Sequence, residues 1–138
     1  MKKRLLIVDG DQRLNKVNEK VILTSGIVDE LHFANNGREA LEFLRSSVSN
    51  NAPLPDVIVF DLQMPVLNGF EFLDQFALMD FPGKSGIELI VYTASSKPSD
   101  KQKAISKGIK YYLSKPYLLR ELKDILIRLS PNSSLTVA

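Results

Sequence analysis

Hydrophobic residues in this 138-residue chain gather in short runs, separated by longer stretches of mixed polarity. Uninterrupted apolar runs of this length are typical of strands in a parallel sheet that is covered on both faces. The run at residues 28–34 is more mixed and is expected near a sheet edge. Together the runs predict strands at residues 4–8, 28–34, 57–60, 87–92 and 110–113.

The stretches between these strands have the spacing of helices. Asp11 is a candidate N-cap of the first helix, whose apolar side is predicted from the spacing of Leu14, Val17, Val21 and either Leu23 or Thr24. Four further helices are expected after residues 35–37, over residues 69–79 and 99–107, and from residue 118 onward.

Five strands alternating with five helices predict an α/β fold with a parallel sheet between two helical layers. We expect one domain over residues 1–130, a short tail over residues 131–138 and no output domain. No internal repeat or coiled-coil heptad is visible in the sequence.

Composition narrows the class of protein. Hydrophobic residues make up 44% and charged residues 25% of the chain, and the net charge of +2 gives no reason to expect nucleic acid as a partner. The absence of cysteine excludes disulfides, thiolate metal sites and a cysteine nucleophile. The opening MKKRLLIV imitates a signal peptide, but its apolar part ends at Asp9, too early for a membrane span. We therefore expect a cytoplasmic protein without a membrane partner.

Polar residues follow four of the five predicted strands. Asp9 and Asp11 come after the first, Asp61 after the third, Thr93 after the fourth and Lys115 after the fifth. In open parallel sheets, ligand chemistry takes place at the carboxyl ends of the strands. The sequence therefore predicts one functional site at that edge.

The residue types at this edge suit phosphoryl chemistry. If the first and third strands are neighbours, the backbones at Asp9 and Asp61 lie about 5 Å apart. Carboxylates that close repel each other unless a cation or proton lies between them, and oxygen ligands of this kind favour Mg²⁺. Lys115 would add a positive charge and Thr93 a hydroxyl donor for a phosphoryl group.

Several segments resemble those of bacterial response-regulator receiver domains. VIVFDLQMPVLNGFEFL resembles the phosphoacceptor segment, IVYTASS and YYLSKP resemble the threonine and lysine segments, and NGREALEFL resembles the second helix. The resemblance extends from residue 4 to about residue 130. It implies a flavodoxin-like, doubly wound sheet with strand order 2-1-3-4-5.

The resemblance also implies roles for individual residues. Asp61 would accept a phosphoryl group from the phosphohistidine of a histidine kinase or phosphotransfer protein, and Thr93 and Lys115 would contact it. Asp9, Asp61 and the backbone carbonyl of Gln63 would bind Mg²⁺. Such a protein is not an enzyme beyond self-phosphorylation and slow autodephosphorylation.

Signalling in such a protein would depend on a switch. The resemblance implies that Thr93 and Tyr112 form this switch, with Tyr112 changing rotamer. The fourth helix, fifth strand and fifth helix would then dock a downstream target that the sequence does not identify; this face includes Lys101, Ile105, Tyr112 and Lys123. The family pattern also implies a cis peptide between Lys115 and Pro116.

One position departs from the family pattern. Receivers usually carry two adjacent acids after the first strand, and the second is normally a direct metal ligand. Here Asp9 occupies the first position and Gly10 the second, with Asp11 one residue later. We expect weakened Mg²⁺ binding, which Asp11 would partly restore.

Two alternatives remain open at this point. The missing acid at Gly10 favours a pseudo-receiver, an interaction module that is not phosphorylated. LLIVDGDQR also resembles the first motif of haloacid-dehalogenase-type phosphatases, with Asp9 as nucleophile and Asp11 as general acid and base. The phosphatase interpretation requires a late pair of acids, but beyond Lys115 the only acids are Glu121 and Asp124, within a predicted helix.

Overall fold

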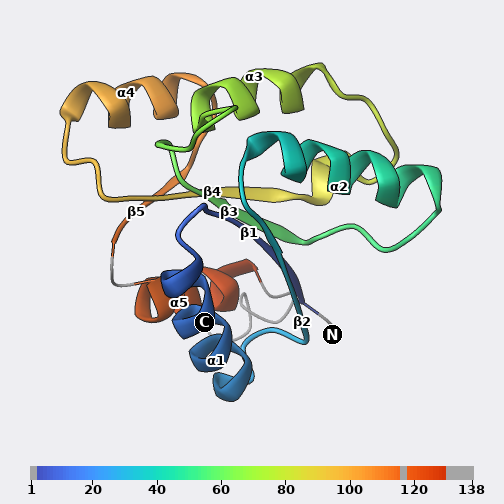
Figure 1. Cartoon of the computed structure of the whole chain (residues 1–138), viewed down its shortest axis with the longest axis horizontal. Helices are drawn as coiled ribbons and strands as arrows, with labels where there is room; N and C mark the ends of the chain where they lie inside the picture. Colours follow the sequence, from blue (N-terminus) through green and yellow to red (C-terminus); the bar gives the residue numbers. More distant parts are fainter. Residues whose placement is uncertain (1–2, 116–117, 130–138) are drawn as a thin grey trace.

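The chain forms a five-stranded sheet between two layers of helices (Figure 1). The computed structural model describes residues 3–115 and 118–129. Its elements in chain order are β1 (Arg4–Val8), α1 (Gln12–Ser25), β2 (Glu30–Ala34), α2 (Gly37–Ser49), β3 (Val57–Phe60), α3 (Gly69–Leu78), the short 3₁₀ helix η1 (Lys84–Gly86), β4 (Glu88–Thr93), α4 (Pro98–Ser106), β5 (Tyr111–Ser114) and α5 (Leu118–Leu129).

All strand pairs are parallel, and the order is β2-β1-β3-β4-β5. This confirms the predicted α/β class, the flavodoxin-like topology and the order 2-1-3-4-5. Helices α2, α3 and α4 cover one face of the sheet, and α1 and α5 cover the other (Figure 1). The carboxyl ends of all five strands therefore open along one edge between the two layers.

Alternation along the central strands divides the core in two. In β1, Leu6 and Val8 pack on the side of α2 and α3, whereas Leu5 and Ile7 pack on the side of α1 and α5. All four side chains are buried, with at most 1% of each exposed. Burial on both faces explains why these strands read as continuous apolar runs in the sequence.

The predicted apolar side of α1 is correct at Leu14, which packs against the core, and wrong at the other positions. Val17, Val21 and Leu23 are exposed, and the buried residues of this helix are Asn15 and Ile22. Two contacts at the start of the helix fix its rotation about its own axis. The Asp11 side chain accepts a hydrogen bond from the Leu14 N–H, and the Asn15 side chain turns inward to bond the backbone of Asp9. The buried side of α1 therefore combines the Asn15 contact with Leu14 and Ile22.

Other predicted boundaries shift by one or two residues. The second strand begins at residue 30 and the fifth at residue 111, and the fourth helix begins at Pro98. In the weakly amphipathic α4, Ala104 is buried whereas Ile105 is 55% exposed. The expected tail over residues 131–138 and the expected cis peptide before Pro116 lie outside the described residues. In the ranges that the structure describes, no helix is long and apolar enough to cross a membrane.

Candidate functional site

The strand order brings the predicted polar residues to one edge of the sheet. Val8 pairs with Phe60, so Asp9 and Asp61 follow neighbouring positions on adjacent strands. Thr93 ends β4, and its backbone carbonyl accepts a hydrogen bond from the N–H of Lys115, which directly follows β5. The carboxylates, the threonine and the lysine therefore meet at the carboxyl ends of β1, β3, β4 and β5.

One ammonium group joins the two carboxylates. Nζ of Lys115 lies 2.6 Å from Oδ2 of Asp9 and 2.8 Å from Oδ2 of Asp61. Only 5% of Asp9 and 8% of Asp61 is exposed. Burial alone would lower the pKa of Lys115, but its hydrogen bonds to Asp61 and Asp9 and the charges of the two carboxylates raise that pKa above the ordinary lysine value. Lys115 is therefore an ammonium ion at any physiological pH.

The segment that follows Asp61 is tightly packed against the strand end. Oδ1 of Asp61, the carboxylate oxygen that does not bond Lys115, accepts a hydrogen bond from the N–H of Gln63 at 3.1 Å. Helix α3 begins at Gly69, where a Cβ atom would lie 2.6 Å from the carbonyl oxygen of Asp61. Glycine is thus required at this position by the close approach of two backbone segments. Asn68 caps the helix in a reciprocal pair with Glu71.

Between these points the backbone makes a strained turn at Val66. Its φ is 70°, and the N–H of Leu67 donates to the carbonyl of Pro65 at 2.8 Å, two residues back. A β-branched residue is unfavourable in this left-handed region. The Val66 side chain is 65% exposed and so gains little from packing.

The turn after β1 holds Asp9 through two hydrogen bonds. Oδ1 of Asp9 accepts the N–H of Asp11 at 2.9 Å, and the Asp9 carbonyl accepts Nδ2 of Asn15 at 2.8 Å. Asp11 is the N-cap of α1, with its carboxylate bonded to the N–H of Leu14 at 3.1 Å. Asp11 would have to leave this cap to ligate a metal directly, so its compensating role remains a prediction.

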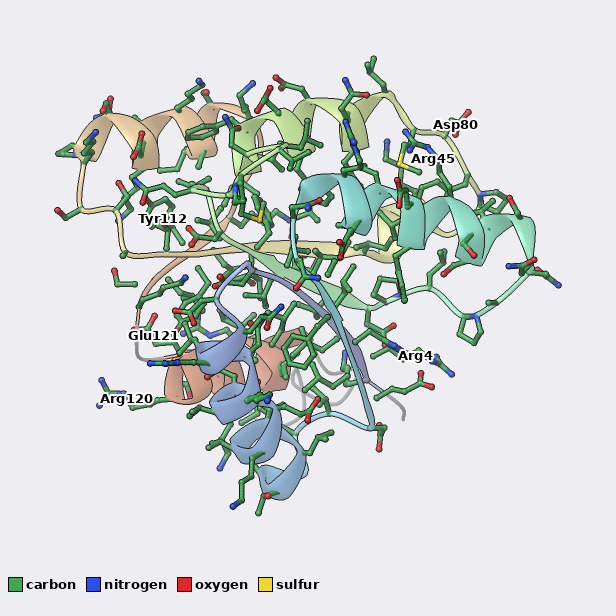
Figure 2. All side chains as sticks on the ribbon, in the orientation of Figure 1. Arg4, Arg45, Asp80, Tyr112, Arg120 and Glu121 are labelled. Carbon is green, nitrogen blue, oxygen red and sulfur yellow. The ribbon has the colours of Figure 1, made fainter. Side chains whose placement is uncertain are left out.

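Thr93 and Tyr112 lie on either side of the β4–α4 loop. Thr93 is fully buried, and its hydroxyl accepts a hydrogen bond from the N–H of Ser95 at 3.2 Å. The Tyr112 hydroxyl donates to the Ser95 carbonyl at 3.5 Å, which is a weak bond. Figure 2 shows Tyr112 on the side of the sheet that α4 covers.

A cavity of about 280 Å³ lies beside this tyrosine, lined by Ser95, Lys101 and Ser114 among others. Burial raises the pKa of the Tyr112 hydroxyl; its bond to Ser95 opposes this rise, and the charges of Asp100 and Asp61 add to it. The side chain is half-buried with space next to it, as a side chain that changes rotamer requires.

The donor set suits a hard divalent cation. Asp9 and Asp61 present buried carboxylate oxygens, and the Lys115 ammonium between them shows that a positive charge is accommodated there. With Gln63 after β3, all the candidate ligands are oxygen atoms, as Mg²⁺ prefers. Within the described part of the chain, no group of three or more His, Cys, Asp or Glu side chains could hold a metal ion. The site therefore has two acids, with Gly10 at the place of a third.

The family model of the response regulator receiver domain matches residues 5–127. The chain belongs to this family. Receiver domains are modules of two-component signal transduction rather than classical enzymes. Their partners are histidine kinases or phosphotransfer proteins, and they generally bind Mg²⁺ or Mn²⁺.

Known receivers resemble this chain in structure and sequence. A two-component response regulator from Cytophaga hutchinsonii superposes with a TM-score of 0.82 at 27% identity, over 94% of this chain and 98% of that one. The Mn²⁺-bound form of response regulator Rcp1 gives 0.71 at 27% identity, over 91% of each chain. A probable transcriptional regulator, ycf29 of Pyropia yezoensis, is 33% identical over 91% of this receiver and 52% of its own length. The receiver spans less than two thirds of the length of these curated relatives.

Sequence reasoning missed two polar residues of this site. Ser95 accepts the Tyr112 hydroxyl through its backbone and donates its own hydroxyl to Asp100 at 2.5 Å. Asn15 bonds the backbone of Asp9. Asn15 shares helical spacing with Asn18 and Ile22, which is a weak signal for its position on the buried side. An asparagine in a helix is nevertheless more typical of a side that faces solvent.

Proposed function

We propose that this receiver accepts a phosphoryl group on Asp61 from the phosphohistidine of a histidine kinase or phosphotransfer protein. Mg²⁺ would be held by Asp9, Asp61 and the backbone carbonyl of Gln63. The observation that carries the proposal is the placement of the Lys115 ammonium within hydrogen-bond distance of both carboxylates. Lysine and threonine next to an acceptor carboxylate provide what phosphoryl transfer requires.

The transfer exchanges one bond for another. An oxygen of Asp61 forms the new O–P bond while the N–P bond of the donor imidazole breaks, and the electron pair stays on the imidazole nitrogen. Lys115 can follow the transferred charge, since its ammonium already contacts Asp61. Thr93 can donate its hydroxyl to a phosphoryl oxygen. Bound Mg²⁺ supplies further positive charge to the phosphoryl oxygens.

Phosphorylation would change the face formed by α4, β5 and α5. If the Thr93 hydroxyl moves toward the phosphoryl group, it leaves space beside β4 that the Tyr112 ring can enter. The two positions of this ring form a two-state element that the site can bias. The face that responds would dock a downstream protein target, and Lys101, Ile105, Tyr112 and Lys123 belong to it.

Chemical phosphorylation tests the proposal. The protein is incubated with acetyl phosphate and Mg²⁺, and the added phosphate is located by mass spectrometry. We expect one phosphate on Asp61, none in Asp61→Asn and normal labelling in Asp80→Asn. Asp80 is an exposed aspartate after α3, far from the carboxyl ends of the strands (Figure 2). Phosphate on Asp9, or undiminished labelling of Asp61→Asn, would overturn the assignment.

Gly10 favours a second candidate, the pseudo-receiver. Without the third acid, the Lys115 ammonium already neutralises much of the charge of Asp9 and Asp61. A site whose negative charge is neutralised in this way could serve as a docking surface that does not change on phosphorylation. The same experiment separates the two candidates, because a pseudo-receiver remains unlabelled at high concentrations of Mg²⁺ and acetyl phosphate.

A further inference from the structure

Asn15 is a buried polar residue whose side chain bonds the backbone of the functional site. It lies in the first turn of α1 with 7% of its surface exposed, and its Nδ2 donates to the backbone carbonyl of Asp9 at 2.8 Å. Oδ1 of the same amide has no hydrogen-bond partner among the described residues. A buried amide that uses only part of its bonding capacity is unfavourable for stability.

The helix turns this amide toward the sheet together with Ile22 and Leu14, and leaves two of its valines outside. Val17 is 59% exposed and Val21 is 40% exposed, although burying either would stabilise the fold. The observed orientation buries Ile22 and packs Leu14 against the core, and it brings the polar Asn15 inside with them. The contact that the rotation produces is the one between Asn15 and Asp9.

The backbone next to this contact contains Gly10. Its φ is not positive, so the turn does not require glycine, and the residue is exposed. Glycine gives the backbone more freedom than any other residue. On one side of Gly10, Asp9 must hold its carboxylate toward Lys115 and Asp61; on the other, Asp11 is fixed as the cap of α1. Asn15 connects the two sides by bonding the Asp9 carbonyl from within the helix.

We propose that Asn15 is a positioning residue of the phosphoacceptor site, which holds Asp9 in place across the flexible Gly10. Asn15 contacts neither the cation nor the phosphoryl group and acts only through the main chain of Asp9. The proposal rests on the proposed function in one respect, namely that Asp9 binds Mg²⁺. It predicts that losing this amide loosens the Asp9 turn and weakens the cation site without unfolding the protein.

The test compares Asn15→Ala with Asn18→Ala. Asn18 lies three residues further along α1 and is half-buried, so the two variants make the same change in the same helix. In metal-free protein, hydrogen exchange of the Asp11 N–H, which donates to Asp9, should accelerate about 3- to 10-fold in Asn15→Ala. Mg²⁺ affinity, measured by calorimetric titration, should fall by a similar factor. Asn18→Ala should change neither quantity.

A second background tests the link to glycine. Gly10→Ala stiffens the turn without adding a carboxylate, and its Cβ atom would lie 3.3 Å from the Asn35 carbonyl oxygen, a contact that a small shift relieves. The effect of Asn15→Ala on Asp11 exchange should be smaller in this background than in the natural one. If Asn15→Ala unfolds the protein, Asn15→Leu, which keeps the volume, provides the same comparison.

The outcomes separate this inference from the proposed function. Equal effects of Asn15→Ala and Asn18→Ala on Asp11 exchange, or an Asn15→Ala effect that is unchanged in Gly10→Ala, would overturn the positioning role. Failure of the natural protein to bind Mg²⁺ or accept phosphate would overturn the proposed function, while the exchange measurements would still decide the role of Asn15.

Discussion

Lys115 Nζ lies 2.8 Å from Oδ2 of Asp61, the proposed phosphoacceptor, and the same nitrogen bonds Asp9. The lysine therefore binds the same two buried carboxylates that would bind a divalent cation. Metal and lysine both neutralise these carboxylates, so in the metal-free protein their charge is balanced by Lys115 alone among the ion pairs of the described residues.

Lys115→Met should destabilise the metal-free protein by about 2–4 kcal/mol, because it leaves two buried carboxylates without a counter-charge. Mg²⁺ should recover much of this loss, so the rise in Tm on adding Mg²⁺ should be larger than in the natural protein. Thermal unfolding with and without Mg²⁺ measures both effects. Lys107→Met is the control, since it removes a pair with Asp74, whose side chain is 61% exposed, and should change stability by less than about 1 kcal/mol. Equal responses of the two variants would contradict the account.

The raised pKa of Lys115 predicts alkaline instability. A lysine with a raised folded-state pKa stabilises the fold fully below its unfolded-state pKa of about 10.5, and this contribution is lost as pH rises through the folded-state pKa. The free energy of unfolding in urea should therefore contain a constant contribution from this group between about pH 6 and 9, and that contribution should decline above about pH 10. Tyr112, whose pKa is also raised, contributes in the same direction. Lys115→Met should flatten the decline, and Tyr112→Phe should remove a separate part of it.

Gly10→Asp should tighten Mg²⁺ binding by about 10- to 100-fold and speed phosphorylation by acetyl phosphate, because it adds a carboxylate beside Asp9. The turn accommodates a side chain: the nearest atoms to a Cβ at Gly10 are the Asn35 carbonyl oxygen at 3.3 Å and a carbon of Pro65 at 4.0 Å. Gly10→Asn has the same size without the charge and should give little of the gain. Equal Mg²⁺ affinities for the two variants in calorimetry would show that the missing acid does not limit the site.

Asp11 has a structural role that can be separated from its predicted metal role. Asp11→Ala should weaken Mg²⁺ binding and phosphorylation and should also lower stability by about 1 kcal/mol, because α1 loses its N-cap. Asp11→Ser keeps a capping oxygen and should retain the natural Tm. If Asp11 also supports the metal, Asp11→Ser will still bind Mg²⁺ more weakly than the natural protein. Unchanged affinity would leave Asp11 as a cap alone.

The switch should be visible by NMR. Adding beryllofluoride and Mg²⁺, a mimic of the phosphoryl group, should change amide shifts throughout α4 and β5 and into α5, including Lys101, Ile105, Tyr112 and Lys123. In Tyr112→Ala the changes near Asp61 should persist, and those in α4 should shrink. Changes confined to the loops around Asp61 in the natural protein would contradict the switch.

The sequence predicted the sheet well because its information is local and redundant. Each central strand is a continuous apolar run that stops at a polar residue such as Asp61 or Thr93. The same short segment therefore indicates both that a strand is present and which of its ends carries the polar group. The strand order was predicted from the family resemblance, because a single sequence does not indicate which distant segments pair with each other. Of the polar groups predicted to meet at the strand ends, the side chains of Asp9, Asp61 and Lys115 do so in the structure.

The errors arose where a side chain bonds the backbone. The rotation of α1 depends on the Asp11 cap and the Asn15 amide, and neither contact has a hydrophobic signature. Ser95 bonds Thr93 and Tyr112 through its backbone N–H and carbonyl, groups that do not distinguish serine from most other residues. Hydrophobic spacing shows which residues a helix could bury, and at α1 the side that is buried also carries the Asn15 hydrogen bond, which the spacing does not reveal.

The strained turn at Val66 offers a practical use. It places an exposed side chain five residues beyond Asp61, in a chain that contains neither cysteine nor tryptophan. A single cysteine introduced there would be the only thiol in the molecule, and because cysteine is not β-branched it fits the left-handed backbone no worse than valine. A fluorophore attached at that position would stand beside the phosphoacceptor without replacing any group that supports it, and could follow the arrival and departure of phosphate in real time.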